Sequence, residues 1–230
     1  MYTIKELFDL SHTTAEKYLS GFVYPQEALA GIGDFVRALG EELSEEDYPT
    51  VAPGVRIHKT ASVAPTAYIG APCVIGAHTE VRPGAFIRGN ALIGADCVIG
   101  NSTEIKNVVI FDGVQVPHYN YVGDSILGYR AHMGAGAVTS NVKGDKSEVV
   151  LRDGDERMAT GRKKVGAFLG DMAEVGCNCV LNPGTVIGRG SRIYPLSSVR
   201  GTVKENHIYK QNGEIVPIRK RTADDAGKKR

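Results

Sequence analysis

Several features that would mark particular classes of protein are missing from this chain of 230 residues. Basic and acidic side chains nearly balance, with 27 Lys and Arg against 26 Asp and Glu, so no global charge favours nucleic acid or an anionic membrane. No apolar run is long enough to span a bilayer. The first residues, MYTIKELFDL, carry acidic side chains and lack the basic start of a secretory leader. These absences predict a cytoplasmic protein that binds neither nucleic acid nor membrane.

Cysteine is too sparse to organise the fold. The four cysteines, Cys73, Cys97, Cys177 and Cys179, do not form the dense framework of a disulfide-stabilised domain. Cys177 and Cys179 are separated by one residue, which is closer than the pairs of a zinc knuckle, and no histidine stands at a matching spacing. The sequence therefore predicts no metal site.

What the chain does contain is an apolar residue at every sixth position. Small or β-branched residues stand four positions after most of them. The first run is Val51, Ile57, Val63, Ile69, Ile75, Val81, Ile87, Ile93, Ile99, Ile105 and Phe111, and the second is Leu169, Val175, Leu181, Ile187, Ile193 and Val199. A period of six fits neither an α-helix nor an isolated amphipathic strand, and is typical of a parallel β-helix. A β-sandwich would need regular hairpin turns, which the repeat lacks.

The predicted fold is an all-β, left-handed parallel β-helix of hexapeptide repeats with a short N-terminal α-helical cap. Residues 1–50 carry helix patterns, with a capping box from Thr3 to Glu6 and a helix opened by Pro25, and are expected to cover the open first coil. The β-helix spans 51–203 and is interrupted by a polar loop or arm at about 140–164. Residues 204–230 are expected to form a hairpin around an Asn-Gly turn, followed by a basic tail from Arg219.

Charged residues replace glycine at some corners of the repeat. In coils of about eighteen residues, Arg88 and Lys106 stack on one edge, and Arg82 and His118 share a second edge, roughly 10 Å apart at strand spacing. One interpretation is a solvated basic edge, with Glu80 and Glu104 as salt partners. The other is an anion site, because Arg and Lys suit phosphate.

His118 favours the second interpretation. It follows Pro117 near a break in the period, since Val122 and Leu127 are only five residues apart. An exposed imidazole beside cations tends to stay neutral and able to accept a proton. Asp124 has the simpler interpretation of a turn residue that orients His118.

The stretches HYNYVGDSILG, MGAGAVTSN, VRPGAFIRG and GNSTEIK resemble the acetyltransferase domain of the bifunctional glucosamine-1-phosphate acetyltransferase / N-acetylglucosamine-1-phosphate uridyltransferase family, over about residues 51–203. The resemblance implies acetyl-CoA-dependent N-acetylation of an amino-sugar 1-phosphate, no metal requirement, and a homotrimer with sites between subunits. It implies that His118 is the general base. The sugar phosphate would contact Arg82, Lys106, Tyr121, His132 and Lys146, and acetyl-CoA would contact Ala135 and Asn141.

Several positions depart from that family. His132 and Val142 stand where the family has Asn and Tyr, and Asp171 and Pro195 stand where it has a Ser and an Ala that hold the CoA arm. The family's Gly-rich G-x-G-T-R-M nucleotide loop does not occur, and residues 1–50 are too few for its nucleotidyltransferase domain. We therefore expect no uridyltransferase activity from this chain alone.

Two alternatives to the enzyme stay open. The first is a non-catalytic or regulatory module that binds sugar phosphate and pairs with a separate nucleotidyltransferase. The second is a carbonic-anhydrase-like metalloprotein, which would need three clustered histidines from His58, His78, His118, His132 and His207. Turnover of acetyl-CoA separates the first alternative from the enzyme, and clustering of the histidines tests the second.

Overall fold

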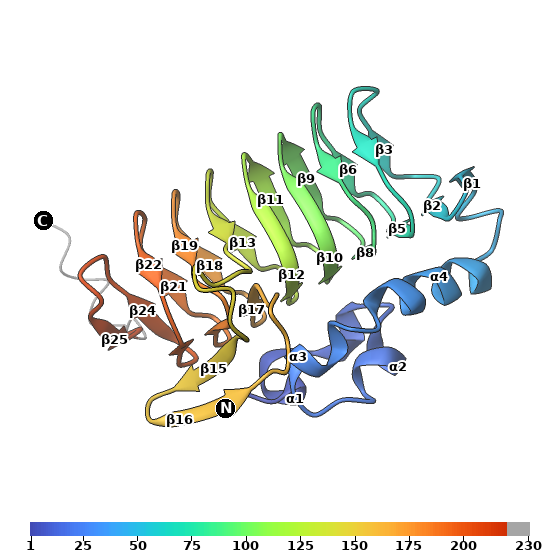
Figure 1. Ribbon diagram of the computed structural model, residues 1–230. Helices are drawn as coiled ribbons and strands as arrows, with labels where there is room; N and C mark the ends of the chain where they lie inside the picture. Colours follow the sequence, from blue (N-terminus) through green and yellow to red (C-terminus); the bar gives the residue numbers. More distant parts are fainter. Residues whose placement is uncertain (220–230) are drawn as a thin grey trace, which may run out of the picture.

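The computed structural model describes residues 1–219, so the basic tail predicted after Arg219 lies outside the described residues. Short parallel strands stack coil upon coil along one axis, and helices lie along one side of the stack (Figure 1). The predicted parallel β-helix of hexapeptide repeats is confirmed. The fold is mostly β, and the helices are confined to the N-terminal segment.

The helical elements are α1 (Ile4–Leu7), the 3₁₀ turn η1 (Leu10–His12), α2 (Glu16–Leu19), α3 (Pro25–Ala28) and α4 (Ile32–Glu42). The strands before the arm are β1 (Thr50–Ala52), β2 (Val55–Ile57), β3 (Ser62–Val63), β4 (Tyr68–Ile69), β5 (Cys73–Ile75), β6 (Glu80–Val81), β7 (Phe86–Ile87), β8 (Ala91–Ile93), β9 (Val98–Asn101), β10 (Glu104–Ile110), β11 (Gln115–His118), β12 (Tyr121–Leu127), β13 (His132–Met133) and β14 (Val138–Thr139). The remaining strands are β15 (Val150–Asp153), β16 (Glu156–Ala159), β17 (Ala167–Leu169), β18 (Glu174–Val175), β19 (Val180–Leu181), β20 (Thr185–Ile187), β21 (Arg192–Ile193), β22 (Ser198–Val199), β23 (Thr202–Val203), β24 (His207–Tyr209) and β25 (Ile215–Pro217).

The parallel strands form three ladders, which are the three faces of the β-helix. The helix-covered face contains β2, β5, β8, β10, β12, β17, β20 and β23. The groove face contains β3, β6, β9, β11, β13, β18, β21 and β24. The open face contains β4, β7, β14, β19 and β22, together with the first halves of β10 and β12. Because β10 and β12 belong to two ladders, each runs continuously around one corner.

The predicted core ladder is correct from Ile57 to Ile105 and then slips, but its first member, Val51, is wrong, because Val51 is 56% exposed on the antiparallel strand β1. Early coils are eighteen residues long, as in the pairing of Val55 with Cys73. The residue that continues the ladder after Ile105 is Ile110, five positions on, and the predicted Phe111 packs against the N-terminal helices instead. The break expected between Val122 and Leu127 is present, and it is the second of two slips at the same corner.

The N-terminal helices lie along one face and do not cap the first coil, which corrects the prediction. Outward residues of the helix-covered face are apolar in successive coils and are buried together with apolar residues of the helices; they are Val74, Leu92, Val109, Ile126, Phe168 and Val186. Strand β1 pairs antiparallel with β2 at the N-terminal end, where a hollow of about 520 Å³ exposes the inward residues of the first coil. The helices pack where they can bury apolar side chains, and the flank of the β-helix presents a longer row of these than its N-terminal end does.

The first helices begin where the capping residues of the sequence predict. The Thr3 side chain accepts from the Glu6 amide at 3.3 Å, and the Glu6 carboxylate accepts from the Thr3 amide at 2.7 Å, so the predicted capping box is present. Pro25 opens α3 as expected, but the helix stops after one turn and restarts at Ile32.

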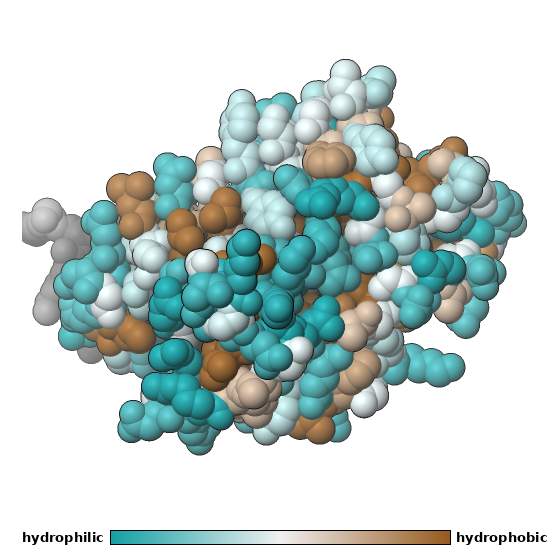
Figure 2. Space-filling view, in the orientation of Figure 1, coloured by the Kyte–Doolittle hydropathy of each residue, from teal (hydrophilic) through white to brown (hydrophobic). Residues whose placement is uncertain are grey.

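The polar arm predicted at 140–164 contains a hairpin of β15 and β16 that folds back beside the N-terminus (Figure 1). Leu151 is 2% exposed and joins the cluster under the helices. At the C-terminal end, β24 and β25 pair antiparallel around the Asn-Gly turn. The surface over the helices and the arm is largely hydrophilic, with apolar residues in separate patches (Figure 2).

Gly100 marks the closest approach of successive coils near His118. A Cβ at Gly100 would lie 1.6 Å from the carbonyl oxygen of Pro117, so any larger residue must push the coils apart. We expect Gly100→Ala to lower the free energy of unfolding by about 3 kcal/mol, the upper part of the usual range for overpacking. Urea unfolding measures this, with Gly144→Ala as the control because nothing lies within 4 Å of its added Cβ. Equal unfolding midpoints for the two variants would contradict the packing.

Candidate functional site

Two corners border the open face and carry most of the predicted site residues. The chain turns from the groove face onto the open face at the histidine corner, where Pro117 and His118 lie. It leaves the open face at the lysine corner, where Arg88, Lys106 and Gly123 align in successive coils. Tyr121 lies on the open face between these two corners. His118, Tyr121 and Lys106 are therefore placed around one exposed face.

The backbone of His118 is fixed while its side chain is exposed. Its amide donates to Asn120 Oδ1 at 3.0 Å, and its carbonyl accepts from the Gly136 amide at 3.0 Å. Asn120 is 3% exposed and donates to the carbonyls of Gly134 and Ala137 at 2.8 and 3.0 Å. An imidazole presented to solvent from a rigid corner suits a proton acceptor for a bound substrate.

Arg82 does not share a row with His118, and this prediction was wrong. Arg82 aligns with Gly100 and then with Pro117, whereas His118 aligns with Asn101, one position further along the corner. The cause is the early slip at Ile105–Ile110, because it shortens this coil from eighteen residues to seventeen. Arg82 and His118 still belong to the same corner, two coils apart.

The basic corners carry acidic partners, as predicted. Arg82 pairs with Glu80 at 3.0 Å, and Arg88 pairs with Glu104 at 2.8 Å. Both pairs are largely exposed, and exposed pairs of this kind contribute little to stability. Their guanidinium groups can therefore exchange a carboxylate for a ligand phosphate at small cost.

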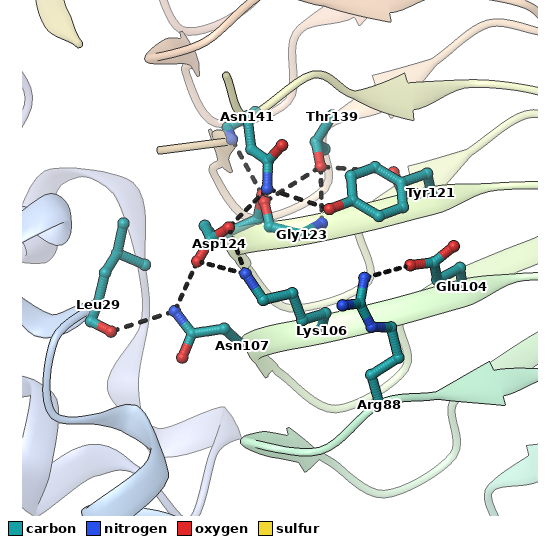
Figure 3. A network of polar contacts seen from close by, with 12 residues as sticks. Leu29, Arg88, Glu104, Lys106, Asn107, Tyr121, Gly123, Asp124, Thr139 and Asn141 are labelled. Carbon is teal, nitrogen blue, oxygen red and sulfur yellow. Dashed lines mark hydrogen bonds and ion pairs between the residues drawn. The ribbon is translucent and has the colours of Figure 1, made fainter. Parts of the chain in front are cut away.

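The lysine corner is organised around a buried carboxylate (Figure 3). The Asp124 side chain is 4% exposed and pairs with Lys106 Nζ at 3.2 Å. It also accepts from Asn107 Nδ2 at 2.9 Å and from Asn141 Nδ2 at 2.6 Å. Asp124 therefore does not orient His118, contrary to the simpler interpretation of the sequence, and it holds Lys106 in place.

Tyr121 joins this network through its hydroxyl. Its oxygen accepts from Asn141 Nδ2 at 3.0 Å, so the predicted acetyl-CoA contact Asn141 and the predicted sugar-phosphate contact Tyr121 are brought together. Burial, followed by the nearby carboxylates of Asp124 and Glu104, raises the pKa of Tyr121. The hydroxyl is therefore protonated at neutral pH and able to donate.

The remaining predicted contacts lie elsewhere. His132 is on the groove face, where Nδ1 lies 2.9 Å from Glu174 Oε2 in a shallow groove of about 430 Å³. Lys146 lies in an exposed turn at the start of the arm, and its amide donates to the Lys143 carbonyl at 2.9 Å. Val142 forms an isolated antiparallel bridge with Lys164 at the base of the arm.

Asp171 and Pro195 lie at different corners. Pro195 stacks with Ala135 and Cys177 at the histidine corner, because Met133, Val175 and Ile193, two residues earlier in each coil, are aligned. Asp171 lies at the third corner, where its carboxylate accepts from the amides of Asp9 and Tyr129 at 2.7 and 2.9 Å. Cys177, which is exposed, is therefore the residue aligned between Ala135 and Pro195.

Asn107 and Asp124 are the site residues that sequence reasoning missed. Both have positive φ, 52° and 50°, at the corner that β10 and β12 round without a break. Asn and Asp adopt this conformation more readily than most other residues. An Asn and an Asp at corresponding corners, where the repeat is shortened, could therefore have indicated that the two residues lie together.

Within residues 1–219, no group of three or more His, Cys, Asp or Glu side chains is arranged to hold a metal ion. The histidines proposed for a carbonic-anhydrase-like site therefore do not cluster within this chain. The same part of the chain contains no helix with the length and apolar character needed to cross a bilayer.

Comparison with known proteins identifies relatives at the sequence level. The family model of the GMPPB C-terminal domain matches residues 71–153. The chain is 32% identical over 192 residues to the bifunctional sugar-1-phosphate nucleotidylyltransferase/acetyltransferase of Sulfurisphaera tokodaii, covering 84% of the chain and 44% of the relative. It is 30% identical over 140 residues to the bifunctional protein GlmU of Methanococcus maripaludis, covering 60% and 34%. The chain is thus similar in sequence to a part of each of these bifunctional proteins.

The resemblance inferred from the hexapeptide motifs is thereby confirmed. The chain spans less than half the length of these homologues. Among solved structures, a hexapeptide transferase family protein from Anaplasma phagocytophilum is 18% identical, with a TM-score of 0.39, and covers 74% of this chain and 80% of that one. Perosamine N-acetyltransferase from Caulobacter crescentus is 16% identical, with a TM-score of 0.34, covering 70% and 55%. Likeness of this degree says nothing about chemistry.

Proposed function

We propose that the chain is a cytoplasmic sugar-phosphate N-acyltransferase that transfers acetyl from acetyl-CoA to an amino-sugar 1-phosphate such as glucosamine-1-phosphate, in UDP-N-acetylglucosamine precursor synthesis. The observation that carries the proposal is the placement of a proton acceptor and a set of donors around one exposed face. His118 lies at the histidine corner, three residues before Tyr121, and Lys106 lies at the lysine corner, where it aligns with Gly123 of the same coil as Tyr121. Homology to bifunctional nucleotidylyltransferase/acetyltransferases supports it.

In this mechanism, the neutral 2-amino group of the sugar attacks the thioester carbonyl and forms the new C–N bond while His118 accepts a proton from the nitrogen. The C–S bond then breaks, and the CoA thiolate leaves and takes up that proton from His118. Lys106, Arg82 and Tyr121 hold the phosphate, with His132 and Lys146 as further contacts, and Ala135 and Asn141 face the acyl donor. Holding both substrates in contact supplies much of the acceleration. Because a neutral amine is a good nucleophile, the transfer needs no metal and no acyl-enzyme.

Apolar side chains on the open face support a homotrimer in which neighbouring subunits complete each site. Tyr68 and Phe86 are 60% and 42% exposed in adjacent coils of this face, and Val180 further along it is 37% exposed. A face that carries both apolar surface and the candidate donors suits contact with a second copy. We infer that the acyl donor binds between copies.

The test is consumption of acetyl-CoA with glucosamine-1-phosphate, measured beside unphosphorylated glucosamine. We expect turnover with the phosphorylated sugar and a much higher KM without the phosphate, because the Lys106 and Arg82 contacts are lost. Equal KM values for the two sugars would contradict the phosphate assignment.

The alternative is a non-catalytic module that associates with a separate nucleotidyltransferase. Pro195 favours it, because a proline in the row of Ala135 and Cys177 has no N–H to donate to a CoA arm. Binding of glucosamine-1-phosphate without turnover of acetyl-CoA, with any amino-sugar phosphate as acceptor, would favour the module over the enzyme.

A further inference from the structure

The lysine corner contains one group that can only accept hydrogen bonds. The Asp124 carboxylate is buried, has no donor of its own, and receives contacts on both oxygens. Oδ1 accepts from Asn107, and Oδ2 accepts from Asn141 and Lys106. An acceptor at the centre of a network fixes the direction of every hydrogen bond around it.

The direction set at Asp124 continues to Tyr121. Asn141 must turn its NH₂ group toward the carboxylate, and the same nitrogen donates to the Tyr121 hydroxyl oxygen at 3.0 Å. Because that oxygen is occupied as an acceptor, the Tyr121 proton is left to point away from the network. The hydroxyl oxygen lies beside Asn141 (Figure 3), and its proton is available as a donor at the open face.

The same carboxylate holds the Lys106 ammonium. An ammonium has three N–H donors, and Asp124 is the partner recorded for it within residues 1–219. The Lys106 side chain is 24% exposed, so the remaining donors have access to solvent. Lys106 and Tyr121 therefore present donors at the open face, where the neighbouring Glu104 carboxylate is paired with Arg88, and such a set of donors can bind an anion.

The network also reaches the N-terminal helices. Asn107 Nδ2 donates to Asp124 and, at 3.2 Å, to the carbonyl of Leu29 in the turn between α3 and α4. Asn107 is 7% exposed, so both contacts are sheltered from water. The helical segment is thereby fastened to the carboxylate that orients the donors.

We propose that Asp124 is a positioning residue for the phosphate of the sugar substrate. Asp124 orients Lys106 directly and orients Tyr121 through Asn141, so that the donors of both side chains face an incoming phosphate. This rests on the proposed function for the identity of the ligand, a sugar phosphate. Asp124 itself does not touch that ligand.

The experiment compares Asp124→Asn with Asp171→Asn. Asp171 is a buried carboxylate at another corner, where it accepts hydrogen bonds from the backbone amides of Asp9 and Tyr129 and so also links the N-terminal segment to the coils. Isothermal titration with glucosamine-1-phosphate and with inorganic phosphate measures affinity without requiring turnover. We expect Asp124→Asn to weaken the binding of both ligands at least tenfold. An amide can donate as well as accept, so the hydrogen bonds around residue 124 could reverse their direction. We expect Asp171→Asn to change affinity less than twofold.

A second pair of variants keeps the test valid if Asp124→Asn does not fold. Tyr121→Phe removes the outward O–H, and Asn141→Ala removes the donor that directs it. If Asn141 acts through Tyr121, the double variant binds glucosamine-1-phosphate no more weakly than the weaker single variant. If the losses of binding free energy in the two single variants add up in the double variant, Asn141 does not act through Tyr121.

The outcomes separate this inference from the proposed function. Loss of binding in Asp124→Asn, together with absent acetyl transfer in wild type, would keep the inference and reject the enzyme. Equal affinities in wild type and Asp124→Asn, or no binding of sugar phosphate by wild type, would overturn the inference.

Discussion

Replacing His118 by Asn is expected to lower kcat for acetyl transfer by about 10²–10⁴-fold, the usual contribution of general acid–base catalysis. Affinity for glucosamine-1-phosphate should stay within about twofold of wild type, because His118 is assigned to the amine and not to the phosphate. The side chain is exposed, so the variant should fold normally. Steady-state kinetics and direct ligand titration measure the two effects separately.

His78→Asn is the matched control for this variant. His78 is also an exposed histidine at a corner, and its φ of 58° is one that Asn adopts readily. It lies in an earlier coil, and we expect wild-type kcat. If His118→Asn retained full kcat, His118 would not be the base.

Phe168→Ala is expected to lower the free energy of unfolding by about 3–5 kcal/mol, as for other buried Phe truncations. Phe168 is fully buried between the helix-covered face and the N-terminal segment, so the cavity would open at that contact. Chemical denaturation monitored by circular dichroism measures the loss. The proposed site should keep its affinity in the folded fraction, since Phe168 is not part of the donor network.

Phe86→Ala removes the same ring from the open face, where 42% of the side chain is exposed. We expect a loss of about 1 kcal/mol, in proportion to the smaller apolar area buried. Comparable losses for the two variants would mean that the helices contribute little to the stability of the chain.

The repeat predicted the architecture because inward positions recur wherever the chain turns. It did not locate the first slip, and the residues Val108, Val109, Ile110 and Phe111 explain why. All four are apolar, so spacings of five and six both place an apolar residue inward after Ile105. Packing decides between the two spacings, and in the structure the second face of this strand is also buried.

The sequence contains a signal for the face on which the N-terminal helices pack, but the six-residue period alone does not reveal it. On the helix-covered face, the residue before the inward one is apolar in every coil from β5 to β20, as in Val74 before Ile75 and Leu92 before Ile93. On the other faces that position is often charged or polar, as in Glu80 and Arg192. Comparing residues one full coil apart would have revealed a face that something must cover.

The chemistry of the site was only partly accessible from sequence. His118, Tyr121 and Lys106 were placed around one face by the repeat and by resemblance. The partner of Lys106 could not be predicted, because the first slip shortens the coil by one residue and so aligns Lys106 with Gly123, which leaves Asp124 one position further along to pair with Lys106. A contact of this kind depends on register, which one residue of slip alters.

In repeat proteins, each unit usually meets only its immediate neighbours, so such molecules can fray gradually from either end. Here the N-terminal segment and the arm together behave like a splint, because they pack on outward residues from Val74 in an early coil to Val186 in a late one. No single coil beneath these segments can unfold unless the segments first lose their packing contacts with it. The solenoid should consequently melt as one cooperative block, in contrast to open-ended repeat arrays that unravel stepwise.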